Sequence, residues 1–269
     1  MKILIKLGGT LLDDPASRRN IARQLAEVAR RHRTVVVHGG GKQVTRYLQE
    51  RGVESRFVGG LRVSDSAVIE AVTSVIAGSV NKQLVASLIA AGASAVGLCG
   101  IDGLLTSAQQ LNPELGFVGR PLETSARLLD LLQSGDYLPV VACIAGDQHG
   151  AIFNVNADQM AVSCAGGWKA DRLIFLTDVP GVKNNAGEVL SHLTIADIRE
   201  LIDSGVAHGG MQAKLEAAQL ALETGVHEVS IALGHEPNVC TRLLDGEKLG
   251  TGLIRTLPAR ESTPSGGVR

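Results

Sequence analysis

Glycines follow two strand-like apolar runs near the start of the sequence. Lys6 interrupts the first run, ILIKL, and Gly8 and Gly9 come soon after it, while the second run, VVVH, leads into Gly40 and Gly41. Backbone N–H groups of such glycines can bind a phosphate or a carboxylate where parallel strands end, and a lysine there adds positive charge. Two such loops favour an anion site more than either would alone. The alternative for Lys6 is an edge-strand lysine that reaches water.

One arginine and two asparagines are candidates for recognising polar ligand groups. Arg62 lies in GLRVSD, ahead of a predicted helix, where a guanidinium can clamp a carboxylate with two parallel hydrogen bonds; a surface arginine is the alternative. In FNVNADQ, Asn154 and Asn156 alternate, so in an extended segment both amides face one side, and Asp158 opens the next helix. Capping of that helix by Asn156 or Asp158 would explain the same residues.

Two later segments have the features of a nucleotide site. A loop follows a very apolar strand and suits a ribose or base, although a plain turn explains it as well. Its residues are Asp178, Val179, Pro180, Gly181, Val182 and Lys183. Lys214 lies in the first turns of the helix that begins at HGGMQAK, where a cation opposes the helix dipole unless a polyanion binds nearby. A solvated lysine is the alternative. His38 is interpreted as a hydrogen-bonded structural histidine.

Short β-branched runs alternate with helical patterns, which predicts an α/β fold with a parallel sheet. The predicted strands are 3–7, 34–38, 95–99, 138–144, 172–177 and 228–232, and the predicted helices are 17–31, 64–91, 124–133, 157–165, 195–204 and 211–224. A turn-rich junction at 166–170 is taken as a lobe boundary. This divides the chain into an N-terminal lobe (1–170), a C-terminal lobe (171–257) and a disordered tail (258–269).

Composition excludes several classes of function. Aromatic residues make up only 3% of the 269 residues and apolar residues 45%, so the core should be aliphatic. A net charge of -1 gives no broad field for nucleic acid or an anionic membrane, and no apolar run approaching ~20 residues is recognised. We therefore expect a cytoplasmic protein. The four cysteines lack C-x-x-C spacing and are expected to be reduced core thiols, and the usual phosphate-binding motifs G-x-x-x-x-G-K-[ST] and G-x-G-x-x-G are absent.

Taken together, IKLGG, VHGGG, GLRVSD, NVNADQ, TDVPGV and GGMQAK resemble, in order and approximate spacing, the amino acid kinase family and within it the acetylglutamate kinases. The resemblance covers 2–257, and GLRVSD and NVNADQ are its specific parts. It implies a three-layer αβα sandwich around an open, mainly parallel sheet. It also implies ATP-dependent phosphorylation of the side-chain carboxylate of N-acetyl-L-glutamate, the second step of arginine biosynthesis. The products would be N-acetyl-L-glutamyl 5-phosphate and ADP.

The same resemblance implies a role for each candidate residue. The residues that would bind the acylamino acid are Gly40, Gly41, Arg62 and Asn154. The transferring phosphoryl group would be stabilised by Lys6 and Lys214, and Asp158 would orient both lysines. ATP would be bound by Gly8, Gly9 and 178–183. The carboxylate acceptor is already ionised at neutral pH, so no general base is needed. Charge compensation is needed, and the lysines, the glycine N–H groups and Mg²⁺ held mainly by the ATP phosphates would supply it.

Two other functions fit the same residues. A kinase for N-acylated aminoadipate differs only in a substrate one methylene longer, and a catalytically silent amino-acid-binding regulator would share the fold. The sequence starts directly at its first strand, whereas arginine-inhibited relatives resemble one another in an added N-terminal helix that builds hexamers. A homodimer formed through the N-terminal lobe and insensitive to arginine is therefore expected.

Overall fold

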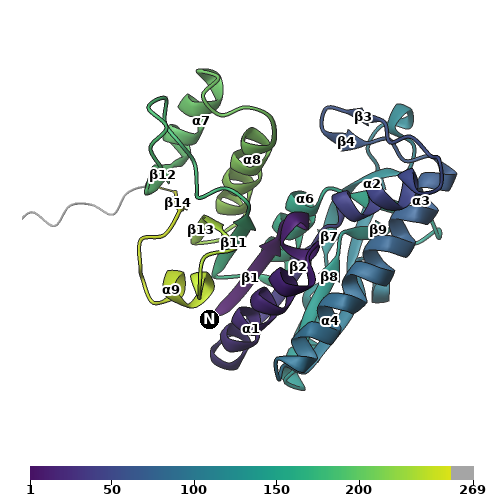
Figure 1. Cartoon of the computed structure of the whole chain (residues 1–269), viewed down its shortest axis with the longest axis horizontal. Helices are drawn as coiled ribbons and strands as arrows, with labels where there is room; N and C mark the ends of the chain where they lie inside the picture. The colour runs from purple at the N-terminus through teal and green to yellow at the C-terminus, as the bar shows by residue number, and fades with distance from the viewer. Residues whose placement is uncertain (256–269) are drawn as a thin grey trace, which may run out of the picture.

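The computed structural model describes residues 1–255, so the predicted tail at 258–269 lies outside the described residues. Its centre is an 8-stranded sheet in the order β12-β14-β13-β11-β1-β2-β8-β5 (Figure 1). The strands are, in that order, β12 (His192–Thr194), β14 (Thr251–Ile254), β13 (Glu228–Leu233), β11 (Arg172–Thr177), β1 (Lys2–Leu7), β2 (Arg33–His38), β8 (Leu138–Ala142) and β5 (Ala95–Cys99). All neighbours from β13 to β5 are parallel, and only the β13–β14 pairing is antiparallel.

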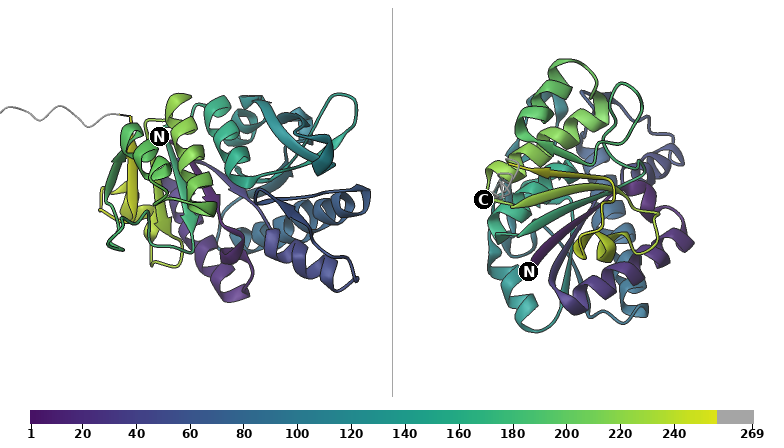
Figure 2. Two further views of the ribbon diagram at one scale, coloured as in Figure 1. Left: turned by 90° about the horizontal axis from the view of Figure 1, so that it is seen from above. Right: turned by 90° about the vertical axis from the view of Figure 1, so that its left-hand side faces the viewer.

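Helices cover both faces of this sheet, which confirms the predicted three-layer α/β architecture (Figure 2). Helices α1, α4 and α9 pack together on one face, and α5, α6 and α8 pack on the other. The helices are α1 (Pro15–Arg31), α2 (Gly41–Gln49), α3 (Ser66–Thr73), α4 (Asn81–Ala90), α5 (Ala126–Ser134), α6 (Ala157–Trp168), α7 (Ile195–Asp203), α8 (Gly209–Glu223) and α9 (Val239–Leu244).

The six predicted strands are present, but the one predicted at 138–144 is two strands. The chain leaves the main sheet after β8 and enters a small closed barrel of short strands. These are β6 (Thr106–Gln110), β7 (Val118–Thr124), β9 (Ile144–Gly146) and β10 (Ile152–Val155). A separate hairpin, β3 (Phe57–Val58) and β4 (Leu61–Arg62), turns at Gly59 and Gly60, both at positive φ.

The predicted helix 64–91 is one continuous run with a π-helical segment, Ser74–Val80, between α3 and α4. The run Ser66–Ala90 is long and apolar enough to cross a membrane by length and composition, so the expectation that no such stretch exists was wrong. In the structure Leu84 and Leu88 are fully buried in the core, and α4 packs against β5 and β8. The run therefore has the contacts of a core helix.

The predicted turn at 166–170 was also wrong in part, because α6 continues through its two glycines and ends at Trp168. Lys169, which follows as the C-cap, has a left-handed backbone (φ 56°). A β-carbon on Gly167 would lie 2.2 Å from the carbonyl oxygen of Thr124, so this glycine permits close packing of α6 on β7. The core is aliphatic as predicted, although Trp168 and Phe175 are its largest fully buried side chains. All four cysteines are buried and free, also as predicted.

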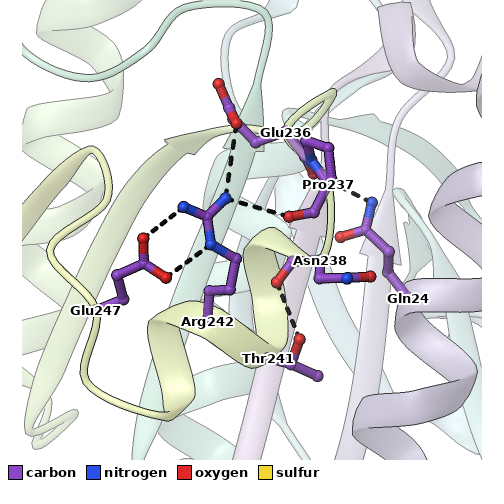
Figure 3. Close-up of polar contacts among 7 residues, drawn as sticks. All are labelled: Gln24, Glu236, Pro237, Asn238, Thr241, Arg242 and Glu247. Carbon is purple, nitrogen blue, oxygen red and sulfur yellow. Dashed lines mark hydrogen bonds and ion pairs between the residues drawn. The ribbon is translucent and has the colours of Figure 1, made fainter.

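An arginine on α9 holds together the loops at the carboxyl end of β13 and the start of β14 (Figure 3). Arg242 forms a two-contact ion pair with Glu247, donates to the carbonyl oxygen of Pro237 at 3.3 Å, and lies 3.7 Å from the carboxylate of Glu236. Gln24 on α1 donates to the Glu236 carbonyl at 3.4 Å. These contacts join α9 to α1 beneath the sheet edge.

Candidate active site

Two lysines from distant parts of the chain meet at one carboxylate. Lys6, at the end of β1, places its Nζ 2.8 Å from Oδ1 of Asp158, and the Nζ of Lys214 on α8 lies 3.3 Å from Oδ2. Lys6 is 6% exposed and Asp158 7%. The structure therefore brings together the three residues that the sequence proposed for phosphoryl transfer. Two ammonium groups on one carboxylate leave one positive charge uncompensated, which a phosphate can neutralise.

Asp158 is held ionised by the two lysines. Burial raises the pKa of its carboxyl group, but the ammonium groups of Lys6 and Lys214 outweigh burial, so the pKa lies below its ordinary value. The backbone around it is fixed by Asn156, whose Oδ1 accepts from the N–H groups of Asp158 and Gln159. Asn156 is therefore the cap of α6, as one sequence alternative held, and its side-chain oxygen is occupied by that role.

The two glycine loops touch each other at the carboxyl ends of β1 and β2. A β-carbon on Gly9 would lie 3.6 Å from the backbone nitrogen of Gly41 and 3.8 Å from the α-carbon of Gly40. A β-carbon on Gly41 would meet open space, so its backbone faces the site without obstruction. Gly8 donates to the carbonyl oxygen of Leu176 at 2.9 Å and ties the first loop to β11. Two groups bound on these loops would therefore be adjacent.

A buried histidine contacts the second glycine loop, 39–41. His38 is 0% exposed; its Nδ1 lies 2.8 Å from the carbonyl oxygen of Gly39, and its Nε2 lies 3.0 Å from Nδ2 of Asn81. The carbonyl can only accept and the amide nitrogen can only donate, so the imidazole is neutral with its proton on Nδ1. Burial lowers its pKa to about 4. The prediction of a structural histidine is confirmed, but Asn81 was not singled out from the sequence.

A pocket of about 170 Å³ lies beside these loops. Its polar lining comes from the glycine loop 39–41, Arg62, Asn154 and Asn156, and its apolar lining includes Val72, Ile76, Val118 and Cys143. The predicted acyl-substrate residues thus line one pocket. Apolar walls suit an acetyl or methylene group, while the arginine and amide suit a carboxylate and a polar substituent.

Arg62 is buried, 7% exposed, and its hydrogen bonds go to neutral oxygens. Its guanidinium donates to Ser55 Oγ (2.5 Å), Thr45 Oγ1 (2.7 Å) and the Gly41 carbonyl (2.9 Å), and it lies 4.7 Å from the centre of the Phe57 ring. Among residues 1–255 no carboxylate lies within 4.0 Å of it. Because a buried charge without a counter-ion is costly, an anionic ligand would complete this arrangement.

Asn154 lies on β10, lines the same pocket and donates to Ser64 Oγ at 3.2 Å. Ser64 is fully buried and donates in turn to the carbonyl oxygen of Arg62 at 3.0 Å. The two predicted substrate residues are therefore connected through a serine that was not singled out from the sequence as a site residue. The cap of α3 is its neighbour Asp65, which accepts from Val68.

The predicted nucleotide loop 178–183 extends from the end of β11, away from the acyl pocket. Asp178 is exposed and accepts from Thr177 Oγ1, whereas Val182 is buried and gives its backbone N–H to Thr251 Oγ1. The Val182 side chain and N–H are therefore not available to a ligand, and its carbonyl oxygen already accepts from the N–H of Leu190 at 2.8 Å. At the start of α8, β-carbons on Gly209 and Gly210 would meet open space, which leaves the helix N-terminus accessible to an anion.

The donor set fits a magnesium ion that arrives with a nucleotide. Within the described part of the chain, no group of three or more His, Cys, Asp or Glu side chains is placed to hold a metal ion. The one buried carboxylate at the site, Asp158, is engaged by two lysines. Phosphate oxygens are the ligands that Mg²⁺ takes in sites of this kind, so the nucleotide would supply most of its coordination.

Known proteins match the chain over nearly its whole length. Residues 1–232 match the amino acid kinase family. The acetylglutamate kinase of Solibacter usitatus is 58% identical over 255 residues, which cover 94% of this chain and 99% of that protein. The acetylglutamate kinase of Bartonella tribocorum is 41% identical, covering 94% of this chain and 89% of that protein.

Two solved structures show the same fold at low sequence identity. An N-acetylglutamate synthase from Neisseria gonorrhoeae, complexed with coenzyme A and N-acetyl-glutamate, superposes with a TM-score of 0.85 at 21% identity, covering 95% of this chain and 59% of that one. A carbamate kinase from Giardia lamblia bound to AMP-PNP gives 0.72 at 18% identity, with coverage of 95% and 98%. The chain therefore belongs to the amino acid kinase family.

Proposed function

We propose that this chain transfers the γ-phosphoryl group of ATP to the side-chain carboxylate of N-acetyl-L-glutamate. The products are N-acetyl-L-glutamyl 5-phosphate and ADP, in the second step of arginine biosynthesis. Acetylglutamate kinases at 41% and 58% identity over 94% of the chain support this activity. The observation that carries the chemistry is the buried carboxylate of Asp158, which spans the ammonium groups of Lys6 and Lys214.

In the proposed complex, the acylamino acid lies in the pocket beside Arg62 and Asn154. Arg62 pairs with its α-carboxylate, since this guanidinium is buried among neutral oxygens. Asn154 binds a polar group of the substrate, and the N–H groups of Gly40 and Gly41 bind the acceptor carboxylate. The small pocket excludes bulky acceptors, but one methylene changes binding by only ~1 to 3 kcal/mol, so N-acylated aminoadipate stays the runner-up substrate.

ATP lies across the carboxyl ends of β1 and β11 in this proposal. Gly9 faces its terminal phosphates, and Gly8, whose N–H is already bonded to the Leu176 carbonyl, leaves room for the phosphates to approach. Loop 178–183 faces the ribose and base, and Lys214 faces the transferring phosphoryl group. Mg²⁺ bound to the phosphates would spread the charge that develops there. The acceptor carboxylate attacks as the anion it already is, so the protein supplies positive charge and alignment rather than a base. Lys6 and Lys214 compensate that charge, and Asp158 keeps both lysines in place.

We further propose two lobes divided near residue 170, and a cytoplasmic homodimer that forms through the N-terminal lobe and is insensitive to arginine. Ile89, on the helical run Ser66–Ala90, is 57% exposed and is one apolar side chain that a partner could cover. Light scattering tests the assembly. A hexamer, or a sigmoidal loss of activity with added arginine, would contradict it.

The function is tested by an ATP-dependent hydroxamate assay with four acceptors in parallel: N-acetylglutamate, N-acetylaminoadipate, glutamate and aspartate. The proposal predicts the highest turnover with N-acetylglutamate. Higher turnover with N-acetylaminoadipate would identify the N-acylated aminoadipate, which is one methylene longer, as the substrate. No turnover with any acceptor would favour the silent amino-acid-binding regulator, which has no need of the Lys6–Asp158–Lys214 cluster.

A further inference from the structure

Gln43 is a buried amide that contacts both glycine loops. It lies in the first turn of α2, directly after the second loop, and is 8% exposed. Its Nε2 donates to the carbonyl oxygen of Gly9 in the first loop at 3.1 Å. The two loops, which follow different strands, are therefore joined by a side chain as well as by direct contact.

The other end of the amide has no partner. Within the described residues Oε1 of Gln43 is buried and accepts no hydrogen bond. It lies 3.7 Å from the position of a β-carbon on Gly9 and 3.8 Å from that on Gly40, so it is located between the two loops. An unsatisfied buried acceptor costs about 1 to 3 kcal/mol, and buried polar atoms of folded proteins are normally paired.

We propose that Gln43 is a positioning residue that fixes the distance between the donor phosphate on Gly8–Gly9 and the acceptor carboxylate on Gly40–Gly41. This inference rests on the proposed function. The hydrogen bond to the Gly9 carbonyl sets the spacing of the loops. Phosphate and carboxylate oxygens cannot donate, so the unpartnered Oε1 accepts from a water molecule bound to the phosphates. Loss of this restraint misaligns the in-line attack while leaving each substrate's own contacts intact.

Gln43→Met removes the amide and retains the length of the side chain. Misplacement of reacting groups by ~1 Å lowers rate about 100-fold, so we expect kcat to fall by about 10- to 100-fold. The KM values for ATP and N-acetylglutamate should stay within about threefold of wild type, because neither substrate loses a direct contact. Gln49→Met is the matched control, since Gln49 lies exposed on the same helix and should leave both parameters unchanged.

Gln43→Glu gives a second signature that a merely structural role would not produce. Its ionised carboxylate cannot donate to the Gly9 carbonyl and repels the bound phosphates, whereas the protonated acid can donate. Burial raises the pKa of a carboxyl group above the ordinary ~4.3. We therefore expect kcat relative to wild type to rise as pH falls from 8 to 5.5. Lys6 on β1 and the Asp13–Arg46 ion pair (2.9 Å) are present in both proteins, so dividing by the wild-type rate removes their own effect on kcat and leaves that of the carboxyl group introduced at residue 43.

The measurement is steady-state ADP release that depends on N-acetylglutamate, with melting temperatures recorded for every variant. A fall in kcat without a matching rise in KM for Gln43→Met, and acid recovery of Gln43→Glu, support the proposal. If Gln43→Met does not fold, the Gln43→Glu profile decides alone. A kcat of Gln43→Met within twofold of wild type, or a wild-type pH profile for Gln43→Glu, would overturn it. Inactive wild-type enzyme would instead refute the proposed function on which it rests.

Discussion

The neutral, buried state of His38 makes the stability of this protein depend on pH between 7 and 5. In the unfolded chain the imidazole has its ordinary pKa of 6.5, and in the folded chain burial lowers the pKa to about 4. Because the folded pKa is the lower one, the unfolded state binds the proton first as pH falls, and the free energy of unfolding decreases. The full stabilisation is present above pH 6.5 and is lost towards pH 4.

The size of this loss follows from the two pKa values. Each pH unit between them removes up to about 1.4 kcal/mol, so lowering the pH from 7 to 5 removes about 2 kcal/mol from the free energy of unfolding. Asp158 does not contribute in this window. Its pKa lies below the ordinary value, so its stabilisation is present above pH ~4 and is lost only in stronger acid.

Urea unfolding at fixed protein concentration measures the effect, with fluorescence of the single tryptophan, Trp168, as the signal. This side chain is fully buried and donates to Asp130, so unfolding exposes it. His38→Gln removes the titration, and its loss between pH 7 and 5 should be smaller than that of wild type by about 2 kcal/mol. His149→Gln, at an exposed histidine, is the control and should behave as wild type. Equal losses in His38→Gln and wild type would refute the assignment.

Three further predictions concern the lysine cluster and the packing of α6. Lys6→Ala and Lys214→Ala should each lower kcat by about 100-fold or more, because each removes an electrostatic donor to the phosphoryl group. Asp158→Asn leaves the ammonium groups of Lys6, which is buried, and of Lys214, which is partly exposed, without a counter-ion. It should therefore lose about 3 kcal/mol of stability, and a bound ATP analogue should raise its melting temperature more than that of wild type. Gly167→Ala should cost about 1 to 3 kcal/mol in urea unfolding, because its β-carbon would lie 2.2 Å from a carbonyl oxygen on β7.

The lysine variants and the Gly167 variant each have a matched control variant in the same protein. The control for the two site lysines is Lys42→Ala, at an exposed position of α2, which should retain wild-type turnover. A near-wild-type kcat of Lys6→Ala or of Lys214→Ala would contradict the mechanism. For α6 the comparison is Gly166→Ala, whose β-carbon would have its nearest contact at 3.4 Å. An equal free energy of unfolding for the two alanine variants would contradict the prediction, because it would mean that β7 shifts to accommodate the added methyl group. An Asp158→Asn protein as stable as wild type without nucleotide would contradict the ion-pair account.

Hydrophobic pattern was sufficient to predict the strands of the main sheet. Strands such as β1 and β11 are buried on both faces and are therefore nearly continuous apolar runs. Among the barrel strands, β6 escaped prediction because its sequence, TSAQQ, is mostly polar, and β7 because charged residues and a proline interrupt its apolar residues, VGRPLET. The turn predicted at the glycines 166–167 was wrong for a different reason. In sequence they are turn formers, but here they sit inside a helix because another segment approaches them closely, and that contact is tertiary.

The site residues were predictable where a motif combined charge with glycine, and not where they act through other residues. Lys6, Asp158 and Lys214 stand out in sequence, and the structure places them within ion-pair distance. Gln43 has no local signal and Asn81 only a weak one, because the groups that they contact belong to other elements. Asn81 interrupts an apolar helical run, which is the weak sign that could have drawn attention to it.

The central claim is that a carboxylate oxygen of N-acetyl-L-glutamate attacks the γ-phosphorus of ATP. It is tested most directly with acceptor labelled by ¹⁸O in its side-chain carboxylate. Hydroxylamine attacks the carbonyl carbon of the acyl phosphate and releases inorganic phosphate, which keeps the bridging oxygen. The account predicts one ¹⁸O in each phosphate released with the hydroxamate, read by mass spectrometry. Phosphate without ¹⁸O would show that the oxygen came from water and would contradict it.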